Sequence, residues 1–303
     1  MKTDFPDSLF KGKYHLTNGP KVVQTPSESA VKVNPIKKPK ILPLYATRWG
    51  PTQSYLKLSL MKTLSVAVFF AVSILVSSAQ TLEKNLGQFN KVIASPRINL
   101  VLMAGETESV KVTYARVDAS KINITLRNKT LRIYLDGSRF TEKQRRVNKD
   151  GWVEKQSLYR DASITAYVTY RKINKLVVRG EQEVDVPGAI ETKKFKLSAY
   201  GECDITLASL QTGKFKVSMY GQHTLRIKSG EVDTQKYKLF GENKIDAQGI
   251  QSEEIASATY GESKLKFNAN ESLRLLTFGE SDVKVKGAAD VSKITFGQVS
   301  VNR

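Results

Sequence analysis

The chain has few of the side chains that metal sites and covalent catalysis most often use. Its 303 residues include one cysteine, Cys203, and two histidines, of which only His223 follows residue 79. A structural zinc site needs four Cys or His ligands, and an intramolecular disulfide needs two cysteines. A Cys–His or Ser–His nucleophile would have to use His223. The composition therefore disfavours most metal-dependent and nucleophilic enzymes.

Other functional patterns are also missing. No glycine-rich phosphate loop opens a helix, and the calcium repeat Gly-Gly-x-Gly-x-Asp is absent. A mostly apolar run of thirteen residues, Leu64 to Val76, is short for a transmembrane helix. We therefore predict no cofactor, no metal site and no membrane span in the mature chain.

Residues Met61 to Ala79 contain the parts of a secretory signal peptide in the expected order. Lys62 follows the methionine, the apolar run comes next, and Ser77-Ser78-Ala79 supplies small residues before a cleavage point. The alternative is a buried strand or core helix. We expect export to the periplasm, the outer surface or the medium.

A signal peptide is expected at the start of a protein, so residues 1–60 need a separate explanation. They are rich in Pro, Lys and Ser without a sustained period, which predicts disorder. We interpret them as a wrongly assigned upstream extension, with translation starting at Met61. A genuine basic linker or an unusually long leader are the alternatives.

The chain is basic with or without this leader. The formal net charge is +19, and residues 80–303 keep 37 Lys and Arg against 26 Asp and Glu, about +11. Such a charge favours anionic partners. Nucleic acid is a poor candidate, because export is expected and no recognition motif accompanies the charge.

A three-residue motif recurs from Arg179-Gly180-Glu181 to the C-terminus, and its successive glycines are 21, 20, 20, 20, 18 and 18 residues apart. The later copies are Tyr200-Gly201-Glu202, Tyr220-Gly221-Gln222, Phe240-Gly241-Glu242, Tyr260-Gly261-Glu262, Phe278-Gly279-Glu280 and Phe296-Gly297-Gln298. A period near 20 indicates a solenoid whose repeats bury their apolar sides by stacking.

The residues around each glycine indicate strands. Apolar residues alternate with polar ones on both sides of the motif, as in Phe195 and Leu197, then Ile205 and Leu207. The repeat is too short for a leucine-rich βα unit or a propeller blade. We therefore predict an all-β, single-stranded parallel β-helix with coils of about 20 residues over 179–303. Residues 80–178 also alternate, and we predict irregular coils of the same helix there. A separate small antiparallel domain is the alternative.

With the signal peptide, the opening Phe89-Asn90-Lys91-Val92 and the repeated corners in place, the chain resembles the head GIN domain family of auto-transporter adhesins. The resemblance covers roughly Leu86 to Val301 and rests on the repeat pattern and layout. It implies a right-handed parallel β-helix, export and an adhesive role. It supplies no active-site residues, and the charged insertion from Thr141 to Ser157 departs from it.

Equivalent positions of successive repeats are called a slot, and two slots carry polar or ionisable groups. Cys203 and His223 each lie two residues after a repeat glycine, so stacking would bring them together as an activated thiol or simply as members of a mixed slot. The preceding slot holds glutamate or glutamine in every copy. We expect these residues to cap corner amides or pair with lysine, with calcium as the alternative.

The aromatic slot and the strand before it are the candidate binding surfaces. The rings should form a column, for which we expect core or half-buried packing. The alternative is an exposed surface on which sugar rings or peptide aromatics could stack. Lysines at outward positions form a basic strip that either protects the surface or attracts an anionic polysaccharide or envelope component. The members of this strip are Lys194, Lys196, Lys214, Lys216, Lys236 and Lys238.

Three functions fit these features. We predict an exported, non-enzymatic adhesin-like protein that binds a glycan or another anionic partner. A polysaccharide lyase would need a basic residue and calcium-binding carboxylates clustered in a groove, and no Asp cluster demands this. A purely structural envelope protein would self-associate without binding glycan. The pattern contains no information on oligomeric state.

Overall fold

The computed structural model describes residues 80–149 and 151–303. The expected extension and signal peptide, 1–60 and 61–79, lie outside this part of the chain. The described elements are β1 (Gln80–Asn85), β2 (Lys91–Ala94), β3 (Asn99–Ala104), β4 (Ser109–Ala115), η2 (Ala119–Lys121), β5 (Ile122–Arg127), β6 (Thr130–Leu135), β7 (Gln144–Lys149), β8 (Trp152–Ser157), β9 (Ser163–Tyr170), β10 (Lys175–Glu191), β11 (Lys194–Ile227), β12 (Gly230–Asp246), β13 (Ile250–Lys286) and β14 (Asp290–Asn302).

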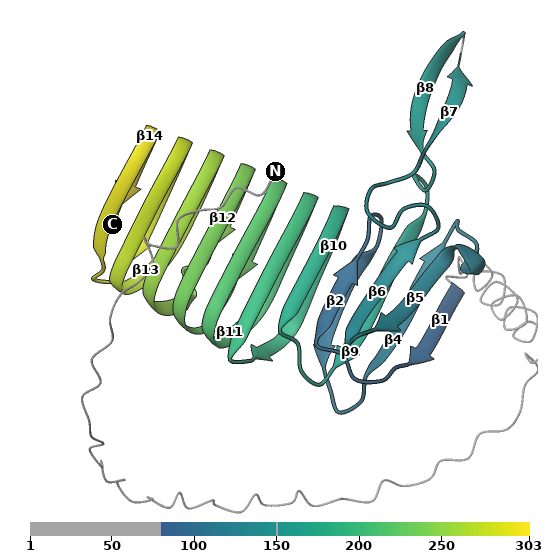
Figure 1. Ribbon diagram of the computed structural model, residues 1–303, viewed down its shortest axis with the longest axis horizontal. Helices are drawn as coiled ribbons and strands as arrows, with labels where there is room; N and C mark the ends of the chain where they lie inside the picture. The colour runs from purple at the N-terminus through teal and green to yellow at the C-terminus, as the bar shows by residue number, and fades with distance from the viewer. Residues whose placement is uncertain (1–79, 150) are drawn as a thin grey trace, which may run out of the picture. The chain divides into compact units, whose positions relative to one another are not determined.

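Strands β10 to β14 form a stack of parallel coils (Figure 1). The strand register places Gly180 opposite Gly201, Gly241 opposite Gly261, and Gly279 opposite Gly297. Equivalent residues of successive coils therefore lie over one another. This confirms the predicted β-solenoid, which has about 6 turns of about 20 residues.

The alternation seen in the sequence produces the interior of the solenoid. In β11, Phe195 and Leu197 are fully buried, whereas Lys194 and Lys196 between and beside them face solvent. Phe195 stacks on Phe215 of the next coil, with ring centroids 5.8 Å apart. Because a solenoid repeat contacts mainly its neighbours, an apolar residue is shielded from solvent largely by the coils above and below it.

Some polar side chains in this interior form hydrogen bonds with one another. Gln235 is fully buried and donates from Nε2 to the Ser252 hydroxyl at 2.6 Å. The Tyr237 hydroxyl donates to the Gln235 side-chain oxygen. Burial also raises the pKa of Tyr237. Such pairing offsets the cost of burying polar groups in an otherwise apolar core.

Residues 80–178 combine the two arrangements that the sequence left open. Strands β2 and β3 pair in parallel with β10 and so continue the coil stack, with Val92 opposite Leu176 and Leu100 opposite Val184. Next to them, β6 is parallel to β2 and β9 is parallel to β3, and only beyond these strands does the pairing change. Strand β4 is antiparallel to both β1 and β9, and β5 is antiparallel to β6.

The charged insertion forms a two-stranded antiparallel sheet, β7 with β8 (Figure 1). Lys149 pairs with Trp152 in this sheet. Gly151 has φ 84°, which suits a tight connection. Within the described ranges, no helix has the length and hydropathy needed to span a bilayer.

Candidate functional site

Each repeat turns at its glycine, and the stacking explains why this residue is glycine. Gly201 has φ 99°, and an added Cβ would lie 2.9 Å from the Gly180 carbonyl oxygen. At Gly261, with φ 122°, the corresponding distance to the Gly241 oxygen is 2.5 Å. Any other residue would be strained by its φ and would press on the coil below.

The aromatic residues that precede these glycines form one continuous outer column. Neighbouring rings have centroids 4.7 to 5.3 Å apart and planes inclined by 4° to 7°. We call them the aromatic column: Tyr200, Tyr220, Phe240, Tyr260, Phe278 and Phe296. Tyr220 is 41% exposed and Phe296 is 62% exposed, so the column lies at the surface.

The column presents ring edges rather than ring faces. Because each ring stacks on its neighbours, both faces of a middle ring such as Phe240 are covered by Tyr220 and Tyr260. A sugar ring binds an aromatic residue through the ring face, so the interior of the column does not suit that mode. Its exposed edges form a narrow apolar surface along the coils.

Arginine and a further ring extend the column into the N-terminal region. Arg179 takes the aromatic slot of the first copy, and its guanidinium carbon lies 5.6 Å from the centre of the Tyr200 ring. The same carbon lies 5.1 Å from the centre of the Phe140 ring. Arg179 therefore connects the aromatic column with Phe140 of the N-terminal region through cation–π contacts.

The six predicted lysines occupy more than one column. Lys216 lies opposite Lys236, and Lys196 lies opposite Lys175, so these four share one outward slot. Lys238 lies opposite Ser218, two residues nearer the corner, and Lys214 lies opposite Thr234, two residues farther from it. Lys194 is at the same distance from its corner glycine as Lys214.

The structure adds two lysines to this slot. Lys175 precedes Gly180 by the same number of residues that separate Lys196 from Gly201, a signal present in the sequence but missed. Lys91 joins only through the parallel pairing of β2 with β10, which sets it opposite Lys175. We call Lys91, Lys175, Lys196, Lys216 and Lys236 the lysine column.

The lysines are close enough to affect one another. Partial burial lowers the pKa of Lys175, and Lys91 lowers it further. Burial also lowers the pKa of Lys196, with contributions from Lys175 and Lys238. Such mutual repulsion means that an anion near the column would relieve a cost already present in the free protein.

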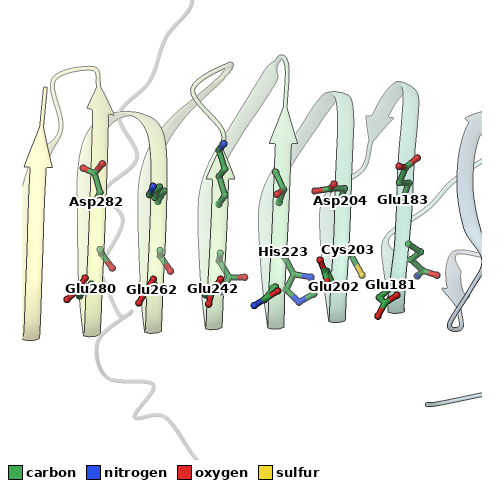
Figure 2. A pocket seen from close by; sticks show the side chains of 18 of the residues that line it. Glu181, Glu183, Glu202, Cys203, Asp204, His223, Glu242, Glu262, Glu280 and Asp282 are labelled. Atoms are coloured by element: carbon green, nitrogen blue, oxygen red, sulfur yellow. The ribbon is translucent and has the colours of Figure 1, made fainter. Parts of the chain in front are cut away.

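On the other side of the aromatic column lies a groove of about 920 Å³ (Figure 2). One wall is the Glu/Gln ladder: Glu181, Glu202, Gln222, Glu242, Glu262, Glu280 and Gln298. Two residues further on, Glu183, Asp204 and Asp282 add negative charge, while Lys244 and Lys264 add positive charge. The groove is therefore predominantly acidic, in a chain that is basic as a whole.

The Glu/Gln ladder faces solvent. At its N-terminal end Glu181 forms an ion pair with Arg97 at 3.4 Å, where Arg97 also contacts Glu142 at 2.7 Å. Backbone near the first two corners is instead contacted by members of the next slot, Gln182 and Cys203. With its amide oriented to satisfy both ends, Gln182 donates to the carbonyls of Ser95 and Ile98 and accepts from the Arg179 amide.

Cys203 and His223 belong to this inner slot. The Cys203 thiol donates to the Gly180 carbonyl at 3.3 Å, and burial raises its pKa to about 12, with Asp204 and Glu202 adding to the effect. Burial lowers the pKa of His223, and its two ring nitrogens have no hydrogen-bond partner in the described chain. A buried neutral thiol bonded to a carbonyl is not an activated nucleophile.

Within the described ranges, no group of three or more His, Cys, Asp or Glu side chains is arranged to hold an ion. The carboxylates of the Glu/Gln ladder follow the coil spacing along the groove rather than converging on one point (Figure 2). The site is consequently described best as three parallel surfaces: lysine column, aromatic column and acidic groove.

Solved structures share this architecture at low sequence identity. A "putative adhesin" from Bacteroides fragilis is 18% identical with a TM-score of 0.59, covering 74% of this chain and 97% of its own. A "putative adhesin" from Parabacteroides merdae is 15% identical with a TM-score of 0.56, covering 75% and 96%. A "putative lipid binding protein" from Parabacteroides distasonis is 13% identical with a TM-score of 0.51, covering 75% and 97%.

The TM-scores show that these proteins share the fold of this chain. No curated protein matches the sequence. The profile of the family described as "Putative auto-transporter adhesin, head GIN domain" matches residues 88–289, which is most of the described chain. The protein therefore belongs to the head GIN domain family.

Proposed function

We propose that the protein is an exported, non-enzymatic adhesin-like protein whose lysine column binds an anionic polysaccharide or another anionic component of the cell envelope. The family and the similar structures support an adhesin-like role. The anionic partner is inferred from the surface of this chain. The observation that carries it is the alignment of Lys91, Lys175 and Lys196 in one slot that continues along the coils.

The geometry suits a linear polymer better than a small anion. Successive lysines follow the coil spacing, about 4.7–4.9 Å, so the positive charge forms a line along the solenoid axis. A polymer that lies along this line contacts several lysines at once, and each contact needs little individual strength. Exposed ion pairs contribute about 0.2–1 kcal/mol each, so affinity would arise from their number.

The test is binding of purified full-length protein to polygalacturonate, with dextran as the uncharged polymer, measured by biolayer interferometry at increasing salt. We expect binding to polygalacturonate that weakens steeply with salt, and none to dextran. The double substitution Lys175→Ala with Lys196→Ala should weaken binding about three- to tenfold at low salt.

A matched control removes the same charge elsewhere. Lys284→Ala with Lys286→Ala changes two exposed lysines of β13 that lie beyond the groove. This control should retain nearly all binding. An absence of polygalacturonate binding at low salt, or equal losses in the two double variants, would contradict the proposed role of the lysine column.

A further inference from the structure

The charges beside the aromatic column are separated by sign. In several coils, basic side chains precede the aromatic slot and acidic side chains follow it. In the coil of Gly201, Lys196 lies on one side of Tyr200, and Glu202 and Asp204 lie on the other. The coil of Gly180 repeats this pattern with Lys175, Glu181 and Glu183, and the coil of Gly279 repeats it with Arg274, Glu280 and Asp282.

Between these flanks runs an apolar surface that water still reaches. Tyr200 is 39% exposed and Phe278 is 37% exposed, although large aromatic side chains are usually well buried. A continuous exposed apolar strip with a charged rim is the pattern of a protein–protein contact. The unusual feature is that its two rims carry opposite charges.

We propose that this surface binds a second copy of the chain around a two-fold axis parallel to the solenoid axis. Such a rotation keeps every coil at its own height and exchanges the two flanks. The aromatic columns of the two copies then meet at the centre. The lysine column of each copy faces the Glu/Gln ladder of the other, and both charged contacts form at once.

The charge pattern within single coils selects this arrangement over the alternative. This axis places each coil opposite the same coil of the second copy. A coil complements its equivalent only if it carries positive charge on one side of the aromatic column and negative charge on the other. The coils of Gly180, Gly201 and Gly279 carry both charges. A two-fold axis perpendicular to the solenoid axis and lying in the contact surface would instead set lysine against lysine. Opposed like charges are unfavourable, so the parallel dimer is preferred.

The common repeat also favours a second copy over other occupants of the groove. The lysine column and the Glu/Gln ladder rise by the same coil spacing, as the ring centroids 4.7 Å apart in the column between them indicate. The charges of the two copies therefore stay in step in the coils that carry both signs. A divalent cation or a polyamine would occupy the acidic groove without involving either the aromatic column or the lysine column.

This inference does not depend on the anionic partner, but the two interactions share the lysines. Polygalacturonate should therefore dissociate the dimer, whereas dextran should not. Substitutions in the acidic groove should remove the dimer and leave polygalacturonate binding in place. The two proposals can thus fail separately.

The first experiment is sedimentation velocity of full-length protein at low and high salt, with charge-reversed variants. Lys175→Glu with Lys196→Glu reverses the charge of the lysine column in the coils of Gly180 and Gly201. Glu183→Lys with Glu202→Lys reverses one of the two acidic side chains in each of the same coils. We expect each variant alone to self-associate at least tenfold more weakly than the unmodified chain. Mixed one to one, they should form a heterodimer of nearly the original affinity.

The mixture makes the test independent of folding defects, because restored association requires both variants to be folded. The control Lys284→Glu with Lys286→Glu changes the same charge outside the surface and should leave the dimer intact. A chain that stays monomeric at about 100 μM and low salt would overturn the proposal. Two variants that fail to associate with each other, or a dimer indifferent to both reversals, would also overturn it.

Cysteine cross-linking tests the direction of the axis. In the parallel arrangement each aromatic residue lies near its own equivalent, so Tyr220→Cys should form an intermolecular disulfide under mild oxidation. The unmodified chain is the control, since its Cys203 is buried. Efficient cross-linking between Tyr200→Cys and Phe278→Cys chains, without self-linking of either, would instead indicate an antiparallel pair and contradict the proposed axis.

Discussion

Phe240 stacks face to face on Tyr220, with ring centroids 4.7 Å apart and planes inclined by 5°, although the two residues are 20 positions apart in the sequence. Tyr260 covers the other face of Phe240 at the same centroid distance. The column is therefore a structural element as well as a surface. Its rings hold neighbouring coils in register from the outside, as the apolar core does from the inside.

The position of a ring in the column should determine how much it stabilises the fold. Phe240→Ala removes two stacked contacts, whereas Phe296→Ala removes one, since Phe296 stacks on Phe278 at the end of the column. Stacked aromatic pairs contribute about 0.5–1.5 kcal/mol each. We expect Phe240→Ala to lower the free energy of unfolding by about twice as much, measured by guanidinium denaturation. Equal losses would show that stacking does not set the stability.

Corner glycines should tolerate no side chain. Gly261→Ala combines a φ of 122° with a Cβ only 2.5 Å from the Gly241 oxygen. We expect the free energy of unfolding to fall by at least about 2 kcal/mol. Gly188→Ala is the control, because no atom lies within 4 Å of its added Cβ, and it should change stability by less than about 0.5 kcal/mol. Similar values for both variants would argue against close stacking at the corners.

The Cys203 thiol should be unreactive while the protein is folded. Burial raises its pKa to about 12, above the ordinary 9.0, so the folded state holds the thiol protonated. The unfolded chain ionises as the pH rises through about 9, and stability that is present below this pH is lost toward pH 12. We expect slow labelling by a maleimide at pH 8 in buffer and rapid labelling in guanidinium.

A serine variant isolates this effect. Cys203→Ser keeps a small polar residue of the kind found at Ser263 and Ser281 in the same slot. Its stability should decline less between pH 9 and 11 than that of the unmodified chain. Rapid labelling of the native protein, or identical pH profiles for the two chains, would contradict a buried neutral thiol.

His223 should destabilise the fold in acid. Burial lowers its pKa below the ordinary 6.5, so the folded state favours the neutral imidazole. As the pH falls below about 6.5, the unfolded chain binds a proton that the folded chain resists, and stability decreases. His223→Asn, which introduces the residue type that Asn243 supplies in the same slot, should flatten the dependence of the guanidinium midpoint between pH 7 and 5. An unchanged slope would exclude His223 as its source.

The sequence was most informative where a rule repeats. The interval between glycines predicted the coil length, and the alternation around Phe195 and Leu197 predicted the buried face, because every coil meets the same neighbours. Lys175 obeyed the same spacing and could have been found by it. Lys91 could not, because its place beside Lys175 results from the pairing of β2 with β10 across more than eighty residues.

The roles of the two polar slots were harder to assign. The sequence favoured the Glu/Gln ladder for capping or pairing with lysine, but Gln182 and Cys203 contact the corner backbone, and Glu181 meets Arg97. The residues one and two positions after the glycine point to opposite sides of the strand. Which of them points inward depends on the direction of the backbone after a glycine of positive φ, and the sequence does not reveal this direction.

By itself, the sequence determined that this protein is a stack of short β coils with a glycine at each corner, because local periodicity expresses a contact that every repeat makes with the next. Only the tertiary structure decided what lies outside that stack. It set the aromatic rings edge-on at the surface between a basic and an acidic flank, and it extended the lysine column with Lys91. It also made β4 antiparallel to β1 and β9, and β5 antiparallel to β6. Those outcomes depend on contacts between segments of unrelated sequence, for which no local pattern exists.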